Sequence, residues 1–136
     1  EFTKDLKKYV NGLDSNMFFS KDISIITDKQ ALKRDLSEKL VITFGTIEGN
    51  LWLAKYKNKF PAKITKDKIV IDKQTCFGTN LQLMVVWSHP QNNDRVVVTF
   101  TSQQEEIFKL GSGIRFKLSN SYFVIKSDEI IKEGKY

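Results

Sequence analysis

Two strand-like segments, each followed closely by a helix-like segment, restrict the fold of this chain more than any other feature. The first pair is the β-branched segment Asp22–Thr27 and the helical pattern of Gln30–Lys39. The second pair is the continuous apolar run Leu40–Phe44 and the helical stripe of Asn50–Tyr56. Two such units in succession are typical of neighbouring parallel strands that are covered by helices and joined by right-handed crossovers.

The remaining strand signals predict antiparallel pairs. Ala62–Thr65 and Lys68–Ile71 predict a short ribbon at the edge of the sheet, and Tyr122–Ser127 predicts a last internal strand before a tail that can add a small hairpin. Gln82–Ser88 and Arg95–Thr101 are the strongest strand signals, and the turn residues between them predict an antiparallel hairpin. We therefore expect an α/β fold: a three-layer α/β/α domain with a mixed sheet, similar to flavodoxin or Rossmann folds.

The ends of the chain and its length suggest one domain with an N-terminal extension. Thr3–Leu13 has the spacing of a short amphipathic helix, and Leu13–Ser20 has the composition of a linker. We therefore divide the chain into an N-terminal helix and linker over 1–20 and a single α/β domain over 21–136. A length of 136 residues with 40% hydrophobic residues suits one packed core. Because the chain opens on Glu1, we expect it to be part of a longer protein.

Charge and composition argue against several classes of partner. The net charge is +6, but the excess is almost entirely lysine spread along the sequence, and the arginines are only Arg34, Arg95 and Arg115. We therefore expect a solvated lysine surface and no nucleic-acid partner. No apolar run approaches the length that spans a bilayer, which predicts no membrane insertion. Cys76 is the only cysteine, so the chain has no internal disulfide and no multi-cysteine metal site.

The most suggestive local pattern runs from Gly45 to Asn50, between a buried strand and a helix. Glycines there let backbone amides approach a ligand, and the start of a helix favours an anion. Other polar residues at strand ends would complete such a site. The candidate ligand-binding residues are Asp28, Gly45, Thr46, Gly49, Asn50, Thr101 and Ser102. The pattern matches neither dinucleotide-binding nor P-loop motifs, and a tight turn with Asn50 as helix N-cap explains the same residues.

No catalytic constellation can be assembled from the sequence. His89 is the only histidine, its neighbour Ser88 points to the opposite face of a strand, and no orienting acid can be assigned. We expect His89 before Pro90 to be structural, with a general-base role as a hypothesis to be tested. No set of carboxylates has the spacing of a metal site, and we expect no catalytic residue, no metal and no cofactor.

Two stretches of the chain carry a resemblance to a known kind of domain. One is the apolar strand, Gly45-Thr46, and Asn50 opening a helix, followed by Phe60-Pro61; the other is the segment 85–98, with its hairpin turn and Arg95 before a Val-rich strand. Together they resemble a small α/β accessory domain that is found beside hydrolase or peptidase domains in exported bacterial proteins. The sequence departs from that pattern at Ser88-His89, Asn93 and Val96.

The resemblance implies an accessory role outside the cytoplasm and carries no catalytic residue over to this chain. Our leading hypothesis is a non-catalytic accessory or interaction domain of a larger exported bacterial hydrolase-type protein, periplasmic or extracellular. Its partner would be the neighbouring domain of the parent chain or another protein. The alternative is a small-molecule module that binds an anionic ligand on the Gly45–Asn50 turn.

Overall fold

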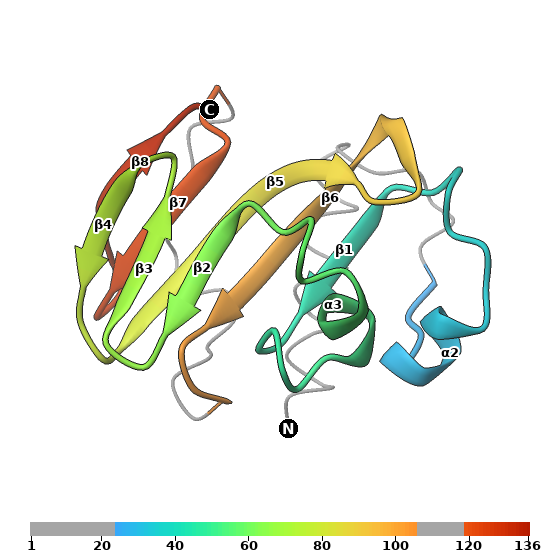
Figure 1. Cartoon of the computed structure of the whole chain (residues 1–136), viewed down its shortest axis with the longest axis horizontal. Helices are drawn as coiled ribbons and strands as arrows, with labels where there is room; N and C mark the ends of the chain where they lie inside the picture. Colours follow the sequence, from blue (N-terminus) through green and yellow to red (C-terminus); the bar gives the residue numbers. More distant parts are fainter. Residues whose placement is uncertain (1–23, 106–118) are drawn as a thin grey trace.

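The fold of this chain is predominantly β. The computed structural model describes residues 24–105 and 119–136, of which 47% lie in strands and 11% in helices. The elements in chain order are α2 (Asp28–Leu32), β1 (Val41–Phe44), α3 (Leu51–Lys55), β2 (Ala62–Thr65), β3 (Lys68–Ile71), β4 (Gln74–Phe77), β5 (Leu81–His89), β6 (Asn92–Ser102), β7 (Tyr122–Lys126) and β8 (Glu129–Gly134). Figure 1 shows their arrangement.

The strands form two sheets. The larger is mixed, with the order β1-β6-β5-β7-β8, and the smaller is an antiparallel meander of β2, β3 and β4. In the larger sheet β1 runs parallel to β6, and the other neighbours are antiparallel. The two longest strands, β5 and β6, form its centre, which agrees with their being the strongest strand signals in the sequence.

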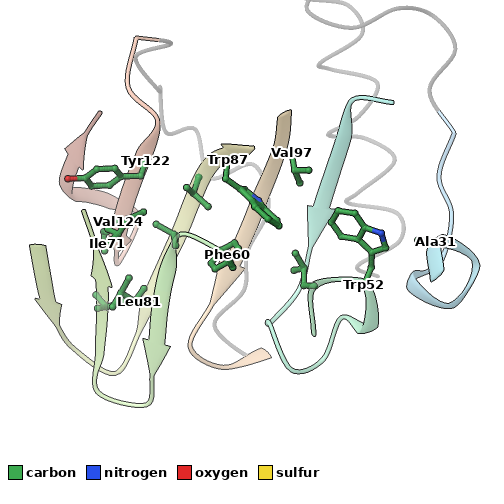
Figure 2. Packing of buried hydrophobic residues seen from close by; sticks show 13 residues of the cluster. Ala31, Trp52, Phe60, Ile71, Leu81, Trp87, Val97, Tyr122 and Val124 are labelled. Atoms are coloured by element: carbon green, nitrogen blue, oxygen red, sulfur yellow. The ribbon is translucent and has the colours of Figure 1, made fainter. Parts of the chain in front are cut away.

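One face of the five-stranded sheet carries the core. Alternate residues of β5, from Leu81 to His89, are buried, and they point to the same face because side chains alternate along a strand. The three-stranded sheet covers part of this face through β3, whose Ile69 and Ile71 are buried in the same apolar cluster (Figure 2). Helix α3 covers a neighbouring part, where Trp52 contacts Trp87 with ring centroids 6.4 Å apart.

The expectation of a three-layer, flavodoxin- or Rossmann-like α/β/α domain is wrong. The described residues form two sheets with little helix, and the layer on the core face is mainly a second sheet. Helix α2 has only five residues, because Asp35 forms a turn with the backbone N–H of Ser37 where the predicted helix would continue. Residues 24–27 form no strand, and the parallel partner of β1 is β6, far along the chain.

Other local predictions are confirmed. The β5–β6 hairpin, the last strand β7 and a hairpin in the tail with β8 all form. The β2–β3 ribbon also forms, but it belongs to the second sheet and not to the edge of the larger one, where it was predicted. Helix α3 begins at the predicted cap Asn50, and β1 matches the predicted strand within a residue. Strand β4 was not predicted, because Gln74–Phe77 has only two apolar residues and no strong alternation.

Some predictions lie outside the described residues. These are the helix over Thr3–Leu13 and the linker before residue 21. The stretch Gln103–Leu110, with Ser102 as its cap, also predicts a helix, and most of it lies outside the described residues. The division into residues 1–20 and 21–136 therefore stays a prediction. Within 24–105 and 119–136, no helix has the length and apolar character needed to cross a bilayer.

Candidate functional site

The turn after β1 is held together by its own side chains. Gly45 has a φ of 114°, a backbone conformation that favours glycine, and its N–H donates to the carbonyl of Phe100 at 3.2 Å. The N–H of Gly49 donates to Thr46 Oγ1 at 2.9 Å, and the N–H of Asn50 donates to the Thr46 carbonyl at 3.0 Å. The turn is therefore closed by internal hydrogen bonds.

Asn50 links this turn to helix α3 with both ends of its amide. Its Oδ1 accepts from the backbone N–H groups of Trp52 at 3.0 Å and Leu53 at 3.1 Å, as an N-cap side chain does. Its Nδ2 donates to the carbonyl of Phe44 at 3.0 Å. The same side chain thus fixes the end of β1 and the start of α3.

Asp28 supplies the remaining acceptor at the start of α3. Its Oδ2 accepts from the N–H of Leu51 at 2.8 Å, so a carboxylate of the protein takes the position where an anionic ligand was predicted. A second carboxylate is close, because a Cβ added to Gly49 would lie 2.7 Å from Glu105 Oε1. Two negative charges beside the turn oppose an additional anion.

The predicted residues of β6 lie next to this turn. Because β1 and β6 are parallel, their carboxyl ends meet, and Thr101 and Ser102 follow the residue that pairs with Phe44. Ser102 Oγ donates to the carbonyl of Gln104 at 2.6 Å. Thr101 is 1% exposed, and its Oγ1 has no hydrogen-bond partner among the described residues. All seven predicted residues therefore belong to one region, and whether they bind a ligand stays a prediction.

A buried polar cluster on the core face was not predicted. Thr43 Oγ1 and Thr99 Oγ1 are 2.7 Å apart across the parallel β1–β6 pair, and Trp87 Nε1 donates to Thr99 Oγ1 at 2.8 Å. This cluster orients the indole against α3 and Phe60. The cluster could not be predicted from the sequence without the β1–β6 pairing, because Thr43 and Thr99 lie opposite each other only in that register.

His89 is fully buried, and both ring nitrogens are used by the fold. Nδ1 accepts from the N–H of Gln91 at 3.1 Å, which assigns the ring proton to Nε2, and Nε2 donates to the Leu36 carbonyl at 2.9 Å. The ring also meets Trp52 edge-on at 6.0 Å. Asn92 strengthens the same contact, because its Nδ2 donates to the Ser37 carbonyl at 2.8 Å. His89 therefore fastens the β5–β6 turn to the segment after α2.

The surroundings of three titratable groups change their pKa values. Hydrogen bonds from Ser37 lower the pKa of Asp35, and partial burial raises the pKa of the Cys76 thiol on β4. Burial raises the pKa of Tyr136 to about 12. Over residues 24–105 and 119–136, no three His, Cys, Asp or Glu side chains are grouped so that they could hold a metal ion.

Comparison of the chain with protein-family models, with curated proteins and with solved structures gave no match in any of the three. The resemblance to an accessory domain of exported bacterial proteins therefore stays a prediction.

Proposed function

We propose that this chain is a non-catalytic accessory or interaction domain of a larger exported bacterial hydrolase-type protein. It would act in the periplasm or outside the cell, beside the neighbouring domain of its parent chain or another protein, and without nucleic acid. The observation that carries the proposal is how the fold uses its polar groups. His89, Asn50 and Asp28, the side chains best suited to chemistry or ligand binding, all make hydrogen bonds that hold the fold together.

An apolar patch beside the two helices supports a role in contact with another domain. Helices α2 and α3 pack on each other and are joined by the bond between Asp28 and the N–H of Leu51. Ile25 and Leu32, close to Asp28 in sequence, are 45% and 38% exposed, and Leu51 itself is 40% exposed. Large apolar side chains grouped on a surface are typical of interaction sites.

The test compares the parent protein with a variant in which two apolar residues of this patch are replaced. The double variant Leu32→Ser/Leu51→Ser should leave the domain folded, because both side chains are substantially exposed, but it should weaken its contact with the neighbouring domain. In calorimetry of the parent chain, we expect the unfolding of this domain to separate from that of its neighbour. Lys33→Ser/Glu48→Ser is the matched control on neighbouring surface, and should leave the unfolding profile unchanged. The proposal fails if the patch variant unfolds like the wild type, or if His89→Gln abolishes an activity while the domain stays folded.

The alternative of an anionic-ligand module retains one favourable observation, the buried and unpartnered Thr101 Oγ1 next to the glycine turn. A screen of nucleotides, sugar phosphates and dicarboxylates by thermal shift tests it. A ligand at about 100 times its dissociation constant would stabilise the domain by about 2.7 kcal/mol. The stabilisation should disappear in Gly49→Val, because the larger side chain would meet Thr46 and Glu105.

A further inference from the structure

The positive charge of the described residues is concentrated in one stretch. Residues 55–77 contain seven lysines and two aspartates, whereas the other described residues contain eight basic and nine acidic side chains. The seven lysines are Lys55, Lys57, Lys59, Lys63, Lys66, Lys68 and Lys73. Lysines are spread along the whole sequence, but the net charge within the described part of the chain comes from this stretch alone.

The fold places this stretch on the outer side of the layer that covers the core. Helix α3, the loop after it and the three-stranded sheet all cover the same face of the five-stranded sheet (Figure 1). In β3, Ile69 and Ile71 point inward, so alternation directs Lys68 outward, and it does the same for Lys63 in β2. We call the outer side of this layer, with the exposed side chains of residues 55–77, the basic face.

The lysines of the basic face are not neutralised by nearby carboxylates. Among the described residues one ion pair forms, between Arg95 and Glu38 at 3.5 Å, and neither residue belongs to the basic face. Lys59 donates to the carbonyl of Pro90, and Lys55 lies 5.3 Å from the centre of the Tyr56 ring. Their charges therefore remain available to an external anion.

A large apolar side chain stands on the same surface. Phe77 pairs with Lys68 across β3 and β4 and is 74% exposed, more than any other large hydrophobic residue described. The strands of this sheet are joined by two-residue turns, at Lys66-Asp67 and Asp72-Lys73, so no long loop projects from the sheet. Lys68 therefore lies beside one exposed aromatic ring on the outer side of this sheet.

We propose that the basic face binds the surface of a bilayer that contains anionic phospholipids. The lysine ammonium groups would lie against the phosphate headgroups, and Phe77 would rest at the boundary with the acyl chains, without any segment spanning the bilayer. A protein partner suits this surface less, because lysine is depleted and arginine enriched at protein interfaces. A nucleic acid suits it less too, because base recognition uses arginine, and single-strand binding uses several stacking rings.

The test is sedimentation of the chain with vesicles of phosphatidylcholine containing about one third phosphatidylglycerol, at an ionic strength of about 0.1 M. Each lysine near such a surface contributes about fivefold to binding, so Lys57→Gln/Lys63→Gln/Lys66→Gln should weaken it by about 100-fold. These three side chains lie outside the core, so the variant should keep the wild-type circular dichroism spectrum. The control Lys29→Gln/Lys33→Gln/Lys39→Gln removes the same charge elsewhere and should change binding by less than about fivefold.

Phe77→Ser separates a bilayer from a soluble polyanion. We expect it to weaken vesicle binding at low and high salt alike, because the apolar contribution is not screened. Failure of the wild type to sediment with these vesicles, or an equal loss in both lysine variants, overturns the proposal. The proposal is also overturned if wild type and Phe77→Ser bind the vesicles equally well and inorganic polyphosphate displaces the protein from them completely. The proposed accessory role does not depend on this inference and would survive its failure.

Discussion

Thr99 and Thr101 lie on one face of β6, and we predict that replacing each by valine changes the stability of the domain in opposite directions. Thr99 and Thr101 are 0% and 1% exposed, two residues apart, and valine is nearly isosteric with threonine. The Thr99 hydroxyl accepts from Trp87 Nε1 and pairs with Thr43, whereas the Thr101 hydroxyl has no partner among the described residues. Replacing each by valine therefore compares a satisfied and an unsatisfied hydroxyl in almost the same setting.

Thr99→Val removes two hydrogen bonds of about 1 kcal/mol each and leaves the buried indole N–H without an acceptor, at about 1 kcal/mol more. Because the variant no longer buries a polar hydroxyl, it recovers about 1 kcal/mol of desolvation cost, and we expect a net destabilisation of about 2 kcal/mol. Thr101→Val removes only a buried group without a partner, and we expect stabilisation of about 1 kcal/mol. The two variants should therefore differ by about 3 kcal/mol in the free energy of unfolding.

Urea unfolding followed by tryptophan fluorescence measures both. With a slope of about 2 kcal/mol per M, the midpoint should fall by about 1 M for Thr99→Val and rise by about 0.5 M for Thr101→Val. If Thr101→Val destabilises as much as Thr99→Val, its hydroxyl has a partner and the reasoning is refuted. In that case the ligand hypothesis for the glycine turn would lose its one favourable observation.

Three further predictions test local features. Asn50→Ala should lower the free energy of unfolding by about 2 kcal/mol in urea, because both the α3 cap and the bond to Phe44 are lost. Asp72 and Lys73 have φ values of 50° and 62° in a two-residue turn, so Asp72→Asn/Lys73→Gly should raise the thermal midpoint, with a gain of about 1 kcal/mol. The Tyr136 pKa is raised to about 12, so stability present below pH 10 should fall as the pH rises toward 12, and Tyr136→Phe should flatten that fall. An unchanged midpoint in the turn variant, or an equal alkaline fall in Tyr136→Phe, would contradict these arguments.

The sequence was most informative where structure depends on neighbouring residues. The cap at Asn50 follows from a side chain that accepts hydrogen bonds just before an apolar helical stripe, and the β5–β6 hairpin follows from turn residues between two β-branched runs. The gathering of Gly45, Thr101 and Asp28 in one region depends instead on the pairing of β1 with β6 and on the bond from Leu51 to Asp28. The cap and the hairpin therefore need little knowledge of the rest of the chain, whereas this gathering needs the whole sheet.

Pairing between distant strands could not be predicted in the same way. Leu40–Phe44 is apolar enough to lie in the middle of a parallel sheet, but nothing in the run says that its partner is β6 rather than an upstream strand. The pattern of Gln30–Lys39 also continues past the point where Asp35 turns the chain. The buried cluster of Thr43, Thr99 and Trp87 depends on that distant pairing, so it was missed with it.

The parallel pairing of β1 with β6 has a consequence for how the chain is made. During synthesis β1 leaves the ribosome long before β6, whereas β2, β3 and β4 can pair as soon as they emerge. Contacts between segments distant in sequence form late, because the entropy cost of closing a long loop comes before the favourable energy of the contacts. The apolar edge of β1 therefore stays unpaired until β6 has been synthesised, and chaperones that shield nascent chains should favour the yield of this domain more than its final stability.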